Sequence, residues 1–225
     1  GTSPEAIGQQ IFAQPTIETL AQRITGEGKT QKADYISIQP IEKKEYYTLS
    51  AAQKRLYILD RMENSGTGYN LSMMLLLEGS LDREHLEWVF QQLICRHESF
   101  RTSFEMQEGE PIQRIHETVE FKVEYFSQGG EETARTPTRS TKTIIKEFIR
   151  PFELSRAPLM RVGIIKEEAA KHVLMVDLHH IIFDGVSQHN LTREFSKLNE
   201  KRSLPGLRLQ YKDYAAWQET RCRQE

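Results

Sequence analysis

One apolar run in this chain ends abruptly in two imidazoles, an acid and a glycine. Residues 172–178 are mostly aliphatic over a short stretch, which indicates a largely buried strand. His179 and His180 follow directly, and residues 186–199 then carry apolar side chains at the i, i+4, i+7 spacing of a helix face. The sequence therefore predicts a strand-to-helix turn, with both histidines at the carboxyl end of the strand.

The two histidines are predicted to serve different purposes. Side chains alternate across a strand, so His179 and His180 point to opposite faces if the strand continues through them. One can then face a reaction site while the other packs. An imidazole with a pKa near ~6.5 can take a proton from an amine or alcohol that attacks a carbonyl carbon. The amino terminus of the following helix would also favour a developing anion.

Structural roles compete with chemistry for the same residues. Asp184 is a residue type preferred at helix N-caps, and we favour that role over direct participation in a reaction. Gly185 suits close backbone approach at a tight turn. A histidine pair at a strand end is, taken alone, more often structural or a metal ligand than a base. Because no cysteine or acidic cluster has the spacing of further ligands, we expect no metal here.

Composition narrows the functional classes. The chain has 225 residues and a formal net charge of −2, with the charges scattered, so it offers no basic field to nucleic acid or anionic lipid. No apolar run approaches the ~18 residues that cross a bilayer, and no secretion signal is evident. Cys95 and Cys222 have neither metal-like spacing nor a disulfide framework. We expect a cytoplasmic protein without membrane or nucleic-acid partners.

The chain is predicted to have three parts. Residues 1–24 end in an amphipathic helix, residues 25–45 form a polar, glycine-bearing linker, and residues 46–225 form the main domain. Within that domain, Ser50 and Gln53 have the spacing of a capping box, and Asp82 is the expected N-cap of a helix that runs to about residue 96.

Strands and helices alternate irregularly through the main domain. A buried strand is predicted over 69–78 and an antiparallel hairpin over 159–178. The other predicted elements are strands over 99–106 and 121–125 and helices at 144–149, 186–199 and 210–223. This mixture favours an α/β fold with a mixed sheet flanked by helices.

Four separated motifs occur in a recognisable order. They span residues 49–57, 96–104, 179–185 and 211–218, and the third has the pattern HHxxxDG. Together they resemble the motifs of the condensation domain of nonribosomal peptide synthetases, a member of the chloramphenicol-acetyltransferase-like superfamily. The second motif departs from the family pattern at Phe100, where leucine is usual.

The resemblance also implies how the chain is organised. Residues 11–21 are similar to the last helix of a peptidyl carrier protein, so residues 1–24 would be the end of a carrier that precedes the condensation domain. A complete domain of this family has two similar lobes with the active site between them. Residues 46–225 would be the amino-terminal lobe, without the opposite wall of the site.

The resemblance implies peptide-bond formation, in which an acyl or peptidyl group passes from an upstream carrier thioester to the amino group of a downstream aminoacyl thioester. His180 occupies the position of the catalytic histidine, as a general base or as the group that positions the amine or stabilises the tetrahedral intermediate. His179, Asp184 and Gly185 would support the turn. Arg101 is a candidate ion-pair partner of Asp184, with an arginine of the missing lobe as the alternative.

The remaining implications concern cofactors and rival functions. No cofactor is expected on the chain itself, because the substrates arrive on the phosphopantetheine arms of donor and acceptor carriers. An epimerisation domain also has a paired-histidine motif, whereas a heterocyclisation domain typically has aspartates there. Residues 55–57 are closer to condensation domains that accept an L-configured donor. The other alternative is a binding and folding unit without turnover, because half a tunnel cannot position two pantetheine arms.

Overall fold

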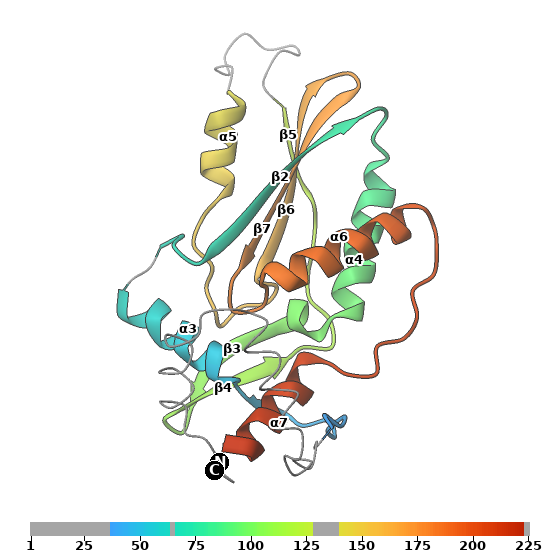
Figure 1. Cartoon of the computed structure of the whole chain (residues 1–225). Helices are drawn as coiled ribbons and strands as arrows, with labels where there is room; N and C mark the ends of the chain where they lie inside the picture. Colours follow the sequence, from blue (N-terminus) through green and yellow to red (C-terminus); the bar gives the residue numbers. More distant parts are fainter. Residues whose placement is uncertain (1–36, 64–65, 128–139, 223–225) are drawn as a thin grey trace, which may run out of the picture. The chain divides into compact units, whose positions relative to one another are not determined.

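The computed structural model describes residues 37–63, 66–127 and 140–222 (Figure 1). The chain divides into two contact units, Gly1–Ser37 and Ile38–Glu225, and the second contains every helix and strand described here. In chain order the elements are β1 (Tyr47–Thr48), α3 (Ala51–Glu63), β2 (Asn70–Glu78), α4 (Arg83–Arg96), the 3-10 helix η1 (Glu98–Arg101), β3 (Thr102–Gln107), β4 (Glu110–Ile115), β5 (Glu124–Ser127), α5 (Thr141–Phe148), β6 (Met160–Glu168), β7 (Lys171–His179), α6 (Gly185–Asn199) and α7 (Tyr211–Cys222).

A four-stranded sheet with the order β2-β7-β6-β5 carries the histidine turn. β6 and β7 form the predicted antiparallel hairpin, and β2 pairs antiparallel with β7 along its whole length. β5 pairs parallel with β6, and α5 lies between these two strands in the chain. The predicted α/β fold with a mixed sheet is therefore confirmed (Figure 1).

The hydrophobic core lies on both faces of this sheet. Leu174 and Leu178 of β7 join a large buried cluster with residues of α4 and α6, while Met175 joins a smaller cluster with Ile144 and Phe148 of α5. Neighbouring residues of β7 thus serve opposite faces, as the alternation of side chains along a strand requires. The strand preceding the turn is fixed by packing from both sides.

The predicted helix starts are confirmed. Ser50 and Gln53 form the capping box, since the Gln53 amide donates to Ser50 Oγ (3.2 Å) and the Ser50 amide donates to Gln53 Oε1 (3.1 Å). Asp82 caps α4 by accepting a hydrogen bond from the His85 amide (3.0 Å). Both helices therefore begin where local side-chain chemistry predicts.

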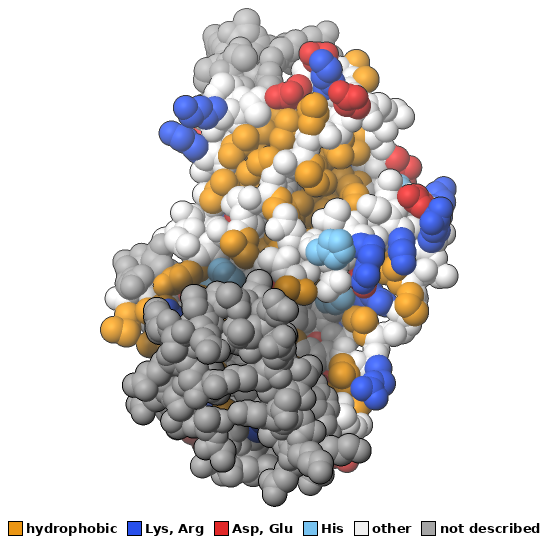
Figure 2. Space-filling model, in the orientation of Figure 1, with side chains coloured by type: hydrophobic (Ala, Val, Ile, Leu, Met, Phe, Trp, Pro, Cys, Tyr) orange, Lys and Arg blue, Asp and Glu red, His pale blue; other side chains and the backbone are white. Residues whose placement is uncertain are grey.

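The prediction that residues 69–78 form a buried strand is wrong about burial. β2 is one of the two edge strands of the sheet, with Leu75 51% exposed and Leu76 59% exposed. A continuous apolar run predicts the strand but cannot distinguish a central strand from an edge strand, because only the topology decides which strands have two neighbours. In Figure 2, hydrophobic side chains gather on the surface over the region that the four-stranded sheet occupies in Figure 1.

A second, three-stranded sheet with the order β1-β4-β3 was not predicted as such. β4 was missed, the start of the predicted strand at 99–106 is η1, and the strand predicted at 121–125 is β5, which begins at Glu124. Glu108 and Gly109 join β3 to β4 with φ angles of 53° and 87°. Two residues with positive φ suit a tight hairpin turn, so the Glu-Gly pair is the signal that could have indicated β4.

The predicted domain boundaries stay predictions. Residues 1–24, with the expected carrier helix, and most of the expected linker lie outside the described residues. Residues 38–45 belong to the same contact unit as the lobe, and the Ile41 amide donates to Asp213 Oδ1 (3.0 Å) at the start of α7. No helix of the described part of the chain is long and apolar enough to cross a membrane.

A buried carboxylate joins α4 to α6. Glu194 of α6 is only 6% exposed, and its Oε2 lies 2.6 Å from His97 Nε2 and 3.1 Å from Arg96 Nε. Burial acts to raise the pKa of Glu194, but the hydrogen bonds and charges of His97 and Arg96 outweigh it and lower this pKa below its usual value. The charged form of Glu194 is therefore the one that the fold stabilises.

Replacement of Gly163 in β6 should destabilise the lobe. A Cβ at this position would lie 2.8 Å from Met175 Cε, 2.8 Å from Phe148 Cε2 and 3.1 Å from Phe126 Cε2. The methionine can move, but two packed rings cannot both do so. Overpacking of this kind costs about 1–3 kcal/mol, so Gly163→Ala should lower the urea midpoint of unfolding. Gly206→Ala is the control, because a Cβ there meets no described atom within 4 Å, and equal midpoints for both variants would contradict this packing.

Glu194→Gln should lower the free energy of unfolding by about 1.5–3 kcal/mol at neutral pH, because hydrogen bonds to a charged group are lost. The lowered pKa of Glu194 sets the pH dependence. The contribution of ionised Glu194 to the free energy of unfolding is present above its unfolded-state pKa of about 4.3. This contribution is lost as the pH falls through the lower folded-state pKa. Urea titrations from pH 7 to pH 3 should show the two proteins converging in acid. Glu200→Gln, at an exposed ion pair with Arg202, should change stability by less than about 0.5 kcal/mol.

Candidate active site

The histidine turn is anchored on both sides by strand backbones. The His180 amide donates to Tyr69 O (2.8 Å), just before β2, and the His179 amide donates to Leu159 O (3.0 Å), just before β6. The Ile182 amide donates back to His179 O (3.1 Å), which closes the turn. Sheet pairing thus continues past the end of β7 and holds both histidine backbones.

The two histidines differ in exposure as predicted. His179 is 2% exposed and lies at the end of β7, whereas His180 is exposed on the turn. The three residues between His180 and Asp184 are all buried and apolar, and they anchor the turn in the core: Ile181, Ile182 and Phe183. The His180 side chain is therefore exposed to solvent, while the three residues that follow it hold the turn in the core.

The His179 ring packs inside the lobe. Its Nδ1 accepts a hydrogen bond from the Ile181 amide (3.1 Å), and its ring centroid lies 6.2 Å from those of Tyr69 and Phe152. Its Nε2 lies 3.7 Å from Asp60 Oδ1 on α3. Burial lowers the pKa of His179 below its ordinary value, and the charge of Asp60 opposes this only in part. The ring is accordingly neutral at neutral pH.

Asp184 is the N-cap of α6, as predicted. Its Oδ1 accepts hydrogen bonds from the Ser187 amide (2.8 Å) and the Ser187 hydroxyl (2.7 Å). These hydrogen bonds lower the pKa of Asp184 below its usual range. Asp184 already brings a negative charge to this helix terminus, so a second anion there would meet electrostatic repulsion. The stabilisation of a developing anion at this terminus stays a prediction, and the cap weakens the case for it.

Arg101 was expected to pair with Asp184, but its partners in the structure are backbone carbonyl groups. Its guanidinium donates to the carbonyl oxygens of Ile94 (3.1 Å) and Cys95 (3.4 Å) in the last turn of α4, and to those of His116 and Glu117 after β4. The last carbonyls of a helix lack intrahelical partners, and a five-donor guanidinium close in sequence satisfies them. Arg101 thus joins α4 to the small sheet, and the expectation of an Arg101–Asp184 pair is corrected.

Gly185 is the first residue of α6 and is exposed. A Cβ built on it would meet no described atom within 4 Å. The lobe itself therefore offers no steric reason for glycine at this position. Close approach of its backbone to a substrate stays a prediction.

Direct contacts bring the four motifs together. The Gln53 side-chain amide of the first motif donates to Ile181 O in the third (3.4 Å). Other links are hydrogen bonds between the hydroxyls of Ser50 and Tyr211 (3.0 Å) and between Lys212 Nζ and Glu98 Oε2 (2.6 Å). The four motifs are therefore linked to one another, and the first contacts the turn of the third directly.

Glu194 is a supporting residue that the sequence patterns did not reveal. Its partner His97 meets Phe100 edge-on, with ring centroids 5.6 Å apart, and Phe100 lies 6.4 Å from Phe183 in the turn. A glutamate in the polar stretch of a helix is usually solvated, so only its position relative to α4 shows that it is buried. The second motif thus reaches the turn through packed rings.

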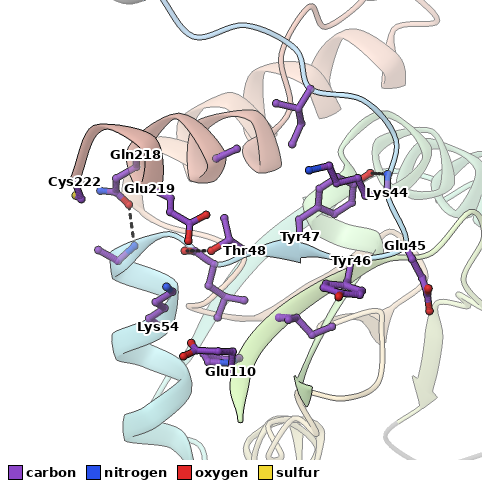
Figure 3. A pocket seen from close by; sticks show the side chains of 16 residues that line it. Lys44, Glu45, Tyr46, Tyr47, Thr48, Lys54, Glu110, Gln218, Glu219 and Cys222 are labelled. Atoms are coloured by element: carbon purple, nitrogen blue, oxygen red, sulfur yellow. Dashed lines mark hydrogen bonds between the residues drawn. The ribbon is translucent and has the colours of Figure 1, made fainter. Parts of the chain in front are cut away.

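A cavity of about 900 Å³ lies elsewhere, between β1, the start of α3, the start of β4 and α7 (Figure 3). Its lining combines Lys44 and Lys54 with Glu110 and Glu219. His180 is not among the described residues that line it. The described part of the chain contains no group of three or more histidine, cysteine, aspartate or glutamate residues that could hold a metal ion.

Several curated relatives of this chain are peptide synthases. A plipastatin synthase of Bacillus subtilis (strain 168) is 48% identical over 212 residues, which are 94% of this chain and 6% of the relative. Gramicidin S synthase 2 of Brevibacillus brevis is 44% identical over 208 residues, 92% of this chain and 4% of the relative. The chain thus spans a small part of the curated relatives that it matches.

Solved structures share the fold. The X-domain from teicoplanin biosynthesis matches with a TM-score of 0.70 at 24% identity, over 83% of this chain and 41% of that chain. The first condensation domain of the calcium-dependent antibiotic synthetase, in complex with a substrate analogue, matches with a TM-score of 0.65 at 18% identity, over 80% and 44%. These likenesses show that the chain shares its α/β fold with these solved domains. The sequence model of the condensation domain family matches residues 43–225, and the chain therefore belongs to this family.

Proposed function

We propose that this chain is the amino-terminal lobe of a condensation domain and that the complete domain forms peptide bonds in nonribosomal peptide synthesis. The observation that carries the proposal is the exposed His180 side chain on a turn whose backbone and neighbouring side chains are fixed. The family model, which covers residues 43–225, and the synthase relatives support it.

The proposed reaction requires His180 only to remove a proton from the attacking amine or to orient this amine. The amino group of the acceptor attacks the carbonyl carbon of the donor thioester, the N–C bond forms, and the amine loses a proton. The tetrahedral intermediate then expels the thiolate of the donor arm, which takes up a proton. A neutral amine is already nucleophilic, so His180 serves as the base for this proton or as the group that orients the amine.

The opposite wall of the site would come from a second lobe. The chain spans 41% and 44% of the two solved domains described above, which supports a partner lobe of similar size. Donor and acceptor carriers would deliver both substrates on phosphopantetheine arms, and the lobe itself would hold no cofactor. The scattered charge and the composition support a cytoplasmic location.

A role in protein binding without turnover is the second candidate. The complex of the X-domain and OxyB from teicoplanin biosynthesis matches this chain with a TM-score of 0.67 at 25% identity. In that structure a domain of this fold is in complex with another protein. Replacement of His180 distinguishes the two candidates, because a binding role does not need an imidazole at the turn.

His180→Ala in the complete domain should lower the rate of condensation between loaded carriers by at least about 100-fold, the lower range for loss of a positioned acid or base. Product formation in a single turnover, followed by mass spectrometry, measures this rate. His189→Ala is the matched control, because His189 is exposed on α6 outside the turn. A His180→Ala rate near that of the unmodified domain would refute the catalytic role.

The 225-residue chain on its own should show no condensation, because one lobe cannot position two pantetheine arms for attack. The same single-turnover assay with both loaded carriers checks this. Product formation by the chain alone, abolished by His180→Ala, would show that the lobe suffices.

A further inference from the structure

The His179 ring uses one nitrogen and leaves the other without a hydrogen bond. Nδ1 accepts from the Ile181 amide (3.1 Å), so the proton of the neutral ring is on Nε2. Nε2 is buried and has no hydrogen-bond partner among the described residues. A buried N–H donor without an acceptor is costly, so a nearby acceptor is expected to serve it.

Asp60 is the acceptor in reach. Its Oδ1 lies 3.7 Å from His179 Nε2, slightly beyond a normal hydrogen bond, so the hydrogen bond requires the two atoms to approach by about 0.5 Å. The Asp60 side chain is 23% exposed, so its carboxylate stays partly hydrated while facing the buried ring. Asp60 also lies in the last turn of α3, where the helix dipole disfavours an acid.

Helix α3 meets the turn at two points. Gln53, Tyr57 and Asp60 are spaced i, i+4, i+7 and therefore share one face of the helix. Gln53 donates to Ile181 O (3.4 Å), and Tyr57 is buried between the two polar residues of this face. Asp60 reaches the ring that holds the Ile181 amide. The same helix face thus contacts the Ile181 carbonyl directly through Gln53 and the Ile181 amide indirectly through the His179 ring.

We propose that Asp60 is a positioning residue of the turn: its carboxylate accepts the Nε2–H of His179 and so keeps the tautomer whose Nδ1 binds the Ile181 amide. The hydrogen bond between His179 Nδ1 and the Ile181 amide then spans His180, which lies between these two residues in the chain. The orientation of the His180 side chain follows from this hydrogen bond. The catalytic consequence rests on the proposed function of His180, whereas the hydrogen bond itself does not.

The bond can be tested in the 225-residue chain by NMR of ¹⁵N-labelled histidine. In the unmodified chain His179 should be protonated at Nε2, with an Nε2–H signal that exchanges slowly with solvent. Asp60→Ala should remove this signal or make its exchange fast, while Asp60→Asn should retain it, because the amide oxygen is still an acceptor. Glu84→Ala, which removes an exposed acid from α4, is the control for loss of charge. An Nδ1–H tautomer in the unmodified chain, or a signal unchanged by Asp60→Ala, would overturn the proposal.

The positioning role is tested by kinetics of the complete domain. Asp60→Ala should lower kcat about tenfold at an unchanged KM for loaded carriers, since a small misplacement of a catalytic group is costly, and Asp60→Asn should stay within about twofold of the unmodified domain. An unchanged kcat in Asp60→Ala after loss of the Nε2–H signal would refute positioning. If His180→Ala is fully active, the proposed function fails, and the NMR result still decides whether the Asp60–His179 bond exists.

Discussion

The pairing of β7 with a strand on each side is the constraint on which the rest of the lobe depends. β2 and β6 both pair with β7 almost from end to end, and the pairing continues beyond it through the bonds of His179 to Leu159 and of His180 to Tyr69. A backbone held on both sides has little freedom left to lose. The turn can therefore expose one imidazole without becoming loose, because its position is set by the sheet.

A buried polar group on β7 reinforces this arrangement across strands. Asp177 is fully buried and accepts hydrogen bonds from Ser72 (2.7 Å) and Asn70 (2.8 Å) of β2 and from Arg161 (3.0 Å) of β6. Burial raises the pKa of Asp177, and these three partners oppose that effect. Arg161 also lies over the Phe152 ring, 3.7 Å from its centroid, beside His179. A polar network in a sheet face specifies strand register, since a slip would leave its members unpaired.

Supporting residues reach the turn from three helices. α3 contributes Gln53 and Asp60, the C-cap of α4 is His97 with its contact to Glu194, and the N-cap of α6 is Asp184. This distribution explains why the first three motifs are far apart in the sequence: each lies at a helix or strand end that contributes to the turn. Arg101, at the end of η1, lies close enough in sequence to the last carbonyl groups of α4 to donate to them, and this accounts for its partners.

The sequence by itself determined the elements whose signals are local. The capping box at Ser50, the Asp82 and Asp184 caps, the β6–β7 hairpin and the opposite exposure of His179 and His180 all follow from short-range hydrogen bonding and side-chain alternation. Only the tertiary structure decided that β2 is an edge strand, that Glu194 is buried and that Arg101 bonds carbonyl groups. These features depend on which distant segments become neighbours, and an apolar run or a lone charged residue looks the same in sequence whichever neighbour it acquires.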